Sequence, residues 1–468
     1  MLNPLGHTGR PRRRLAALGV AMLAVLTACT PAAPTGPDPP ATARSLPPGS
    51  ASPLQPADWP TYHHDNARTG VGSAAPLGTP AVLSQAWAAR LDGAMYGQPL
   101  VLGTTIIAAT ENDTVYGLAA ADGHVLWSRH LGDPQSLSDL PCGNIDPLGI
   151  TGTAAYDPDT GQVFVVAELR GGRHLLAGLD PSDGTVTLSR PVEPPRGDPG
   201  AHQQRAALTV LGGYVYVAYG GLYGDCGNYV GSVVAAPTTG LGPLRSYAVP
   251  TSREGGIWAP GGAAVGGNRL LYAVGNGEST SDYDHSDSVL ALTPELTLAD
   301  SFSPGEWADD NEHDRDLGSM GPTVAGRFVY ANGKRGVGYV LDGTRFGGIG
   351  GQLSQQPVCA AYGGSSVEGT SMYLPCRDGT RRVDLDTAGR ATVRWRAPVP
   401  AAGSPVVGGG AVWTVDLSGG ILYALDPGTG AVRASVSVGA VPHFASPTLS
   451  GTRAYVGTLS GVTAVDGA

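Results

Sequence analysis

Residues 421–439, with the sequence ILYALDPGTGAVRASVSVG, contain the pattern that decides the fold. An apolar stretch ends in Ala-Leu-Asp, a short turn with glycine follows, and a second stretch of small and β-branched residues completes the unit. In the Asp-x-x-x-Gly turn from Asp426 to Gly430, we expect the aspartate to accept hydrogen bonds from backbone N–H groups and the glycine to adopt a positive φ. The unit therefore predicts two antiparallel strands joined by a tight turn.

The same unit recurs along the chain. Two further plain copies are TVYGLAAADGHVLWSRHLG at 114–132 and HLLAGLDPSDGTVTLSRPV at 174–192. Four degenerate copies keep the same order: SVVAAPTTGLGPLRSYAV, SVLALTPELTLADSFSP, GYVLDGTRFGGIGGQLS and RRVDLDTAGRATVRWRAP. A small-residue approach and an apolar strand precede the unit, and repeats of about 40 to 50 residues with roughly four strands each are typical of propeller blades.

The ends of the chain are expected to close the ring. Seven units end near Gly439, and an eighth, PHFASPTLSGTRAYVGTLSGVTAVDG, stops before its outer strand. The stretch from Leu83 to Leu91, with Trp87 at its centre, has no partner of its own and can supply that strand. Pairing of the N- and C-terminal strands removes free sheet edges. We predict an all-β chain with one eight-bladed propeller over 57–468, with seven blades as the alternative.

The N-terminus is expected to be an export signal. Four arginines between positions 10 and 14 precede an apolar run at 15–26, which is short for a membrane span and typical of a signal-peptide core. The run ends in Leu-Thr-Ala-Cys, which resembles a bacterial lipobox. This predicts a signal peptide over 1–28 and an extracytoplasmic protein anchored to the bacterial cell membrane through lipidated Cys29, with an ordinary signal peptide as the alternative. Residues 29–56 are rich in Pro and Ala and predict a disordered tether.

Composition limits the remaining possibilities. The 468 residues carry 29 basic and 39 acidic side chains and a formal net charge of −10, so we expect no nucleic-acid partner. Four cysteines follow Cys29, an even number that favours two disulfides in an oxidising compartment. Cys359 and Cys376 are close enough in sequence to join neighbouring strands, which would leave Cys142 to pair with Cys226. The other two pairings stay open.

The repeats and the opening motif DWPTYHHDNARTG resemble those of pyrroloquinoline quinone (PQQ) proteins. The stretch from Gly255 to Asp342 resembles quinoprotein alcohol dehydrogenases segment by segment. In that family a tryptophan forms the floor under the quinone, and GGIWAP places Trp258 at that position. An asparagine of the family binds Ca²⁺, and YAVGNG places Asn276 there.

Further positions of the family carry charged groups. The acidic loop DDNEHDRDLGS offers Asp314 or Asp316 as the catalytic base, and NGKRGVGYVLD supplies Lys334 as the basic group on the quinone carbonyl. GDCGNY offers Asp225 as a second ligand of Ca²⁺, a cation that prefers hard oxygen ligands. The resemblance therefore implies PQQ and Ca²⁺ as cofactors and the oxidation of an alcohol or a sugar.

The chain also departs from this family. Two adjacent cysteines cover the other cofactor face in the family, whereas this chain has Cys142-Gly143, so a vicinal disulfide cannot form. Propellers without catalytic activity share the same repeats. Two other functions therefore stay open. One is a scaffold with protein partners, which would resemble the propeller lipoprotein of outer-membrane assembly, and the other is a lipoprotein that binds sugars or polymers.

Overall fold

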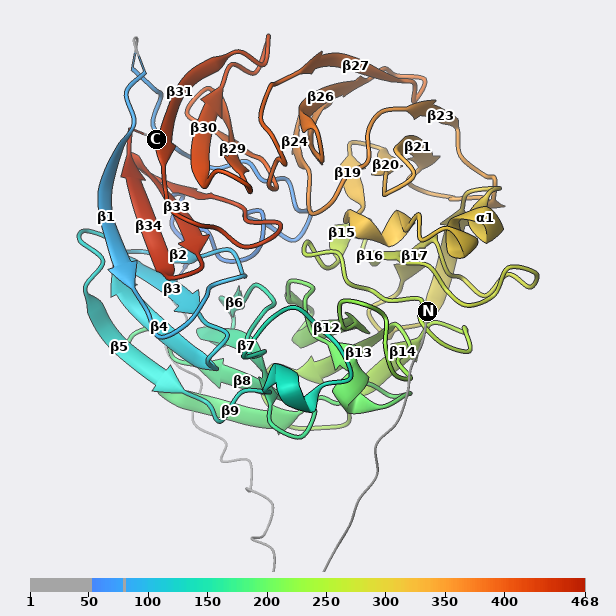
Figure 1. Cartoon of the computed structure of the whole chain (residues 1–468), viewed down its shortest axis with the longest axis horizontal. Helices are drawn as coiled ribbons and strands as arrows, with labels where there is room; N and C mark the ends of the chain where they lie inside the picture. Colours follow the sequence, from blue (N-terminus) through green and yellow to red (C-terminus); the bar gives the residue numbers. More distant parts are fainter. Residues whose placement is uncertain (1–52, 79–80, 468) are drawn as a thin grey trace, which may run out of the picture. The chain divides into compact units, whose positions relative to one another are not determined.

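The computed structural model describes residues 53–78 and 81–467 and shows eight β-sheets arranged as blades around a central axis (Figure 1). The eight-bladed all-β prediction is confirmed. Within each blade the strands run antiparallel to their neighbours, except for one short parallel addition. The predicted signal peptide, Cys29 and most of the predicted tether lie outside the described residues.

Blades 1 to 4 follow one another along the chain, each beginning with its innermost strand. Their strands are, for blade 1, β2 (Leu100–Leu102), β3 (Thr105–Ala109), β4 (Thr114–Ala119) and β5 (Val125–His130); for blade 2, β6 (Ala155–Asp157), β7 (Gln162–Leu169), β8 (Arg173–Leu179) and β9 (Val186–Pro191); for blade 3, β10 (His202–Gln203), β11 (Thr209–Leu211), β12 (Tyr214–Gly221), β13 (Ser232–Pro237) and β14 (Arg245–Ala248); and for blade 4, β15 (Ala264–Gly266), β16 (Arg269–Val274), β17 (Ser288–Leu292) and β18 (Leu298–Ser303).

Blades 5 to 8 continue in the same way. Their strands are, for blade 5, β19 (Thr323–Ala325), β20 (Phe328–Ala331), β21 (Val337–Asp342) and β23 (Ser354–Pro357); for blade 6, β24 (Ser366–Glu368), β25 (Ser371–Cys376), β26 (Gly379–Leu385) and β27 (Ala391–Arg396); for blade 7, β28 (Val406–Gly408), β29 (Ala411–Asp416), β30 (Ile421–Leu425) and β31 (Val432–Ser437); and for blade 8, β32 (Thr448–Ser450), β33 (Arg453–Thr458), β34 (Gly461–Asp466) and β1 (Ser84–Arg90). The short helices are η1 (Leu137–Asp139), η2 (Pro199–Ala201), α1 (Trp307–Glu312) and η3 (Leu317–Ser319).

Blade 8 closes the ring as the sequence predicts. Strand β1 from the N-terminal side pairs antiparallel with β34 from the C-terminal end, with Ser84 opposite Asp466 and Arg90 opposite Gly461. In Figure 1 the blue strand β1 lies beside the red strand β34. Because the first and last parts of the chain share one sheet, the outer strand of blade 8 is supplied and the ring has no open seam.

The repeated unit forms the third and fourth strands of a blade, and its tryptophan joins neighbouring blades. Trp127 on β5 packs against Gly184 in the turn of blade 2, where an added Cβ would lie 2.4 Å from the indole ring, and its Nε1 donates to the carbonyl of Pro181 at 3.0 Å. Trp395 on β27 makes the same contact with Gly430 of blade 7. Glycine is needed here both for this close approach and for φ values of 70° and 74°.

One degenerate copy differs from the expected pattern. After β21, the glycine-rich stretch 343–353 does not continue directly into the outer strand of blade 5. Part of it forms β22 (Gly348–Ile349), which pairs in parallel with β18 of blade 4, and the outer strand β23 begins only at Ser354. This copy therefore links blades 4 and 5 by backbone hydrogen bonds.

Both expected disulfides are present. Cys359 pairs with Cys376, and Cys142 pairs with Cys226 across 84 residues of sequence. The second bond connects the loop after η1, which leads from blade 1 to blade 2, with the loop between β12 and β13 of blade 3. In the described part of the chain, no helix is long and apolar enough to span a membrane.

The opening motif DWPTYHHDNARTG runs along the inner strands of several blades. Its backbone bonds to inner strands around the ring, including Trp59 with Val101 of blade 1 and Val71 with Val407 of blade 7. At its centre, His63 is fully buried, and its ring nitrogens contact the Ser365 carbonyl at 2.9 Å and the Ser446 hydroxyl at 3.1 Å. Burial lowers the pKa of His63 to about 3, so this residue is a neutral structural contact.

Candidate functional site

Four residues that the sequence singled out lie together on one face of blades 4 and 5. Trp258 lies on the approach to the inner strand β15, and Asn276 follows the second strand β16 of the same blade. Lys334 follows β20, the second strand of blade 5, and Asp316 immediately precedes η3 in the connection between the two blades. The ends of β16 and β20, the second strands of blades 4 and 5, thus lie beside the turn before η3 that connects the two blades.

The buried carboxylate of Asp316 is the centre of this group. Its Oδ1 accepts a hydrogen bond from the Asn276 backbone N–H at 2.5 Å, and its Oδ2 lies 2.6 Å from the Lys334 ammonium. The same ammonium lies 5.7 Å from the centroid of the Trp258 ring, within the range of a cation–π contact. We call Trp258, Asn276, Asp316 and Lys334 the axial cluster.

Glycines allow this close packing. A side chain at Gly275 would meet the Asp316 carboxylate at 2.6 Å and the Trp258 Nε1 at 3.0 Å. A side chain at Gly333 would meet the Asp316 carbonyl oxygen at 2.2 Å. The glycines next to Asn276 and Lys334 in YAVGNG and NGKRG are therefore required for the turn to reach both blades.

The charges of the axial cluster depend on burial. Burial raises the pKa of Asp316, and the neighbouring Lys334 ammonium and Asn276 amide oppose this increase by stabilising the carboxylate. The pKa of Lys334 is raised overall. Burial lowers it, but the carboxylates of Asp316 and Asp314 raise it by more, so the ammonium stays charged. Behind them, burial and the charge of Asp316 raise the pKa of Asp287 well above its ordinary value, which favours a neutral carboxyl group.

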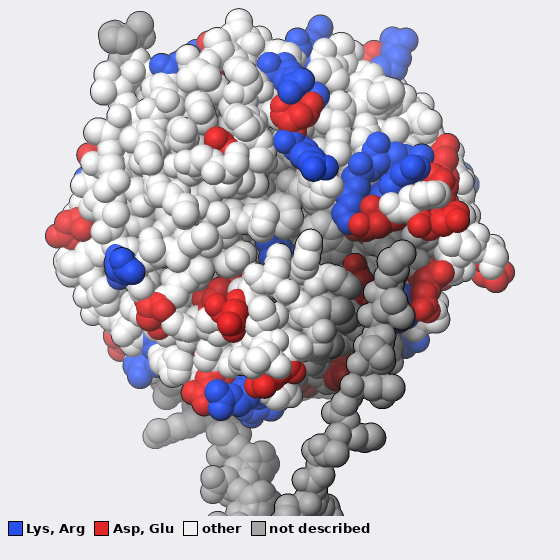
Figure 2. Space-filling view, viewed as in Figure 1, with Lys and Arg blue, Asp and Glu red and all other residues white. Residues whose placement is uncertain are grey.

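The structure distinguishes the two candidate bases. Asp314 lies 2.6 Å from Lys334 with its side chain largely exposed, whereas Asp316 is 3% exposed. The rest of the acidic loop forms α1 and is ion-paired, with Asp309 contacting both Arg315 and Arg335. Figure 2 shows acidic and basic side chains gathered at one edge of the face, on the side where Figure 1 places α1. Asp316 is therefore the candidate that faces the interior of the site.

Asp225 does not join the axial cluster directly. It is exposed in the loop between β12 and β13, where its Oδ1 accepts a hydrogen bond from the Tyr229 hydroxyl at 2.6 Å.

Glu254 is a carboxylate beside Asn276. The next residue in the chain, Gly255, donates its backbone N–H to the Asn276 carbonyl at 2.8 Å. Burial raises the pKa of Glu254, and Arg253 opposes this increase. Glu254 directly precedes the GGIWAP motif, and this adjacency could have identified it.

The donor atoms around Asn276 fit a hard cation in kind. Glu254 and Asp316 provide carboxylate oxygens, and the side chain of Asn276 provides an amide oxygen, which are the ligand types that Ca²⁺ prefers. Among the described residues, no three acidic, histidine or cysteine side chains lie close enough together to form a metal site. The ligand types are therefore present, but they are not gathered into a preformed site.

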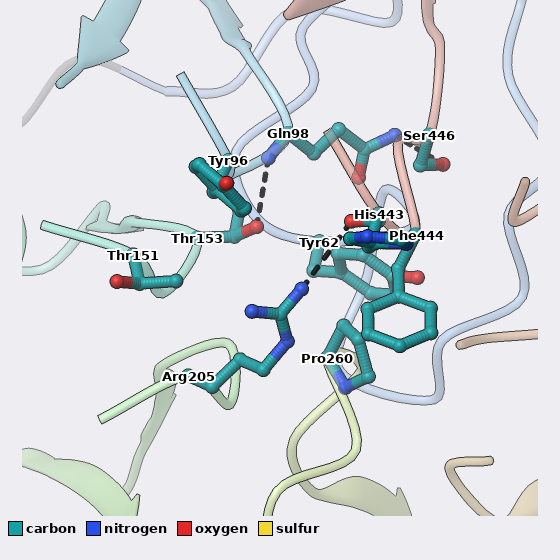
Figure 3. A pocket seen from close by; sticks show the side chains of 10 residues that line it. All are labelled: Tyr62, Tyr96, Gln98, Thr151, Thr153, Arg205, Pro260, His443, Phe444 and Ser446. Carbon is teal, nitrogen blue, oxygen red and sulfur yellow. Dashed lines mark hydrogen bonds between the residues drawn. The ribbon is translucent and has the colours of Figure 1, made fainter. Parts of the chain in front are cut away.

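A cavity near the axis of the ring is shown in Figure 3. Tyr62 of the opening motif lines it, and residues on the approaches to the inner strands provide most of its walls. Phe444 lines the same cavity, and its ring centroid lies 6.1 Å from that of Trp258 at an interplanar angle of 47°. The free room is about 10 Å³, comparable to one water. A planar cofactor that stacks on Trp258 therefore requires Phe444 to move.

Arg205 and Phe444 are further residues of this site that sequence reasoning missed. Arg205 lies between β10 and β11, and its guanidinium enters the axial cavity (Figure 3). Phe444 has a φ of 67°, which is uncommon for a residue other than glycine. No local repeat pattern marks either position, because both lie in loops whose direction depends on the whole ring.

Comparison with known proteins agrees with the propeller fold. Residues 84–281 match the family model described as outer membrane protein assembly factor BamB. The fold is a PQQ-type propeller. The quinohemoprotein alcohol dehydrogenase ADHIIG from Pseudomonas putida HK5 has a similar structure, with a TM-score of 0.67 and 16% identity over 88% of this chain and 80% of that one.

Two further solved structures share this PQQ-type fold. BamB from Moraxella catarrhalis has a TM-score of 0.59 and 18% identity, over 82% of this chain and 99% of that one. A europium-containing methanol dehydrogenase has a TM-score of 0.65 and 15% identity, over 88% and 98%. No curated protein matches the chain. At these identities the likeness shows the fold, which enzymes and non-enzymes share.

Proposed function

We propose that the axial cluster binds a quinone of the PQQ type together with Ca²⁺ and that the protein oxidises an alcohol or a sugar. The observation that carries this proposal is the buried carboxylate of Asp316, held between the Asn276 N–H and the Lys334 ammonium beside the Trp258 ring. When bound, the quinone would supply a two-electron acceptor and Ca²⁺ a Lewis acid. Structural similarity to an alcohol dehydrogenase supports the same class of reaction.

The residues of the chain have separate roles in this proposal. Trp258 offers an aromatic face for a planar ring. The Lys334 ammonium has three N–H donors, of which two point to Asp314 and Asp316, so one is left for a ligand oxygen. Asp316 takes a proton from a ligand hydroxyl group, and its raised pKa makes it a better proton acceptor. Asn276 supplies an amide oxygen to the cation.

Calorimetric titration of the mature domain with PQQ, with and without Ca²⁺, tests the proposal. We expect saturable binding that requires Ca²⁺, because cation and cofactor would share the ligand atoms around Asn276. The loaded protein should then reduce an artificial electron-accepting dye in the presence of an alcohol or a sugar. Absence of both quinone binding and dye reduction over a broad panel of alcohols and sugars would reject the enzyme proposal.

A second candidate function is a non-catalytic propeller that binds protein partners. The observation that favours it is Phe444, which packs near Trp258 and leaves the axial cavity about 10 Å³ of room. The similarity to BamB supports the same alternative. If the titration shows no quinone binding, this candidate becomes the better account of the chain.

We also propose that the protein is an extracytoplasmic lipoprotein anchored to the bacterial cell membrane through Cys29. The proposal rests on the lipobox that ends the short apolar run. We expect the wild-type protein to incorporate an acyl label and to fractionate with membranes, and Cys29→Ala to lose both properties. Labelling that survives Cys29→Ala, or wild-type protein found entirely in the culture medium, would contradict the proposal.

A further inference from the structure

Arg205 occupies an unusual electrostatic position in the axial cavity. Its guanidinium lies between two aromatic rings, 4.6 Å from the centroid of Phe444 and 5.6 Å from that of Tyr96. Figure 3 shows the group pointing into the cavity from the loop before β11. Contacts of this kind with aromatic faces hold the plane of the guanidinium in one orientation.

The hydrogen-bonding capacity of Arg205 is mostly unused. An arginine side chain has five N–H donors, and the structure gives this one a single hydrogen bond, from Nη2 to the His443 carbonyl at 3.3 Å. Its Nε is buried without a partner among the described residues. No carboxylate in that part of the chain forms an ion pair with it, and Glu111 acts on it only through longer-range attraction.

Arg68 provides an internal comparison. This arginine is 5% exposed, and it donates five hydrogen bonds to backbone carbonyl and hydroxyl oxygens around it. The same fold therefore satisfies one buried guanidinium completely with its own atoms. Arg205 lines a cavity instead, half-buried and with one hydrogen bond from Nη2, and its buried Nε has no partner among the described residues. Arg68 thus finds all its hydrogen-bond partners within the protein and Arg205 does not, which points to a partner of Arg205 that comes from solution.

We infer that Arg205 and the rings of Tyr96 and Phe444 form a binding site for the carboxylate group of a small organic ligand. The planar fork of a guanidinium matches the two oxygens of a carboxylate. The free room of about 10 Å³ is comparable to one water, so entry of a carboxylate group requires a side chain that lines the cavity, such as Phe444, to move. This site is separate from the axial cluster and requires neither quinone nor metal.

Calorimetric titration of the metal-free mature domain with acetate tests this site. We expect saturable binding with one acetate per chain. The affinity should fall at least tenfold in Arg205→Gln, which loses the charge, and also in Arg205→Lys, which keeps the charge but not the planar fork. Arg345→Gln provides the matched control, because Arg345 is exposed on blade 5, and it should bind like the wild type.

Several results would overturn the assignment. These are absence of saturable acetate binding, unchanged affinity in Arg205→Gln, and tighter binding of inorganic phosphate than of acetate. If the Arg205 variants do not fold, chemical modification of the wild-type protein with phenylglyoxal tests the site instead. Acetate should then protect Arg205 but not Arg345, as measured by peptide mass spectrometry, and equal modification of both would reject the site. Quinone and Ca²⁺ are absent throughout, so failure here leaves the quinone proposal unaffected.

Discussion

Asp316→Asn is expected to reduce quinone-dependent oxidation by the loaded domain by at least a hundredfold. The substitution removes the carboxylate that accepts a proton, and general base catalysis contributes about 10² to 10⁴ in rate. It preserves the shape of the side chain and an oxygen for the Asn276 N–H, so the fold should be kept. The measurement is the rate of dye reduction at saturating PQQ and Ca²⁺, together with the circular dichroism spectrum.

Asp314→Asn is the matched control for this experiment. Asp314 also contacts the Lys334 ammonium at 2.6 Å, but its side chain is largely exposed. We expect less than a tenfold loss of rate in this variant. Wild-type turnover by folded Asp316→Asn, or an equally large loss in Asp314→Asn, would contradict the assignment of Asp316 as the base.

The second large effect concerns stability above neutral pH. Asp113 is fully buried, and burial together with the nearby charge of Glu111 raises its pKa to about 9. The ordinary pKa of an aspartate is near 4, so in the unfolded chain this carboxyl is already ionised at pH 7. The folded protein thus holds a proton that the unfolded chain has lost, and its free energy of unfolding falls as the pH rises.

The expected decrease can be calculated for the window from pH 7 to pH 9. One extra proton bound by the folded state corresponds to about 1.4 kcal/mol per pH unit, and Asp113 is half-ionised at its folded pKa of about 9, so the loss reaches about 2 kcal/mol over this window. Glu111 and Glu168 are also buried carboxyl groups with raised pKa values, about 7 for Glu111, so much of the effect of Glu111 falls below this window. Burial lowers the pKa of His63 and His202, and their unfolded pKa of about 6.5 lies below the window, so these two histidines oppose the decrease only slightly.

Asp113→Asn should remove most of this pH dependence, because asparagine cannot ionise. Urea unfolding at several pH values measures the effect, with Glu295→Gln as the control at an exposed position. The control should retain the wild-type slope. A wild-type free energy of unfolding that stays constant or increases from pH 7 to pH 9 would show that Asp113 does not keep its proton in the folded protein.

The sequence by itself determined the architecture. The repeated unit around Asp180 and Asp426 could be identified because its turn and strands are local, and each copy forms two neighbouring strands of one blade. The unpaired stretch around Trp87 and the incomplete eighth unit predicted the closing strand pair β1–β34. These predictions succeeded because strand formation and turn geometry depend on residues that are close along the chain.

The resemblance to quinoproteins also identified residues that the tertiary structure brings together. Trp258, Asn276, Asp316 and Lys334 belong to two blades, and η3 joins them into one cluster. Their order in the sequence could be recognised, but the choice between Asp314 and Asp316 could not be made. That choice required knowledge of which carboxylate is buried.

Only the tertiary structure revealed the axial cavity. Arg205, Phe444 and the opening motif are far apart in sequence, and they meet because eight blades direct their inner strands toward a common axis. Whether a guanidinium finds partners there depends on loops from opposite sides of the ring. Local sequence patterns determine which strands form, whereas ring closure determines which side chains face one another across the axis, and this is why Arg68 is satisfied and Arg205 is not.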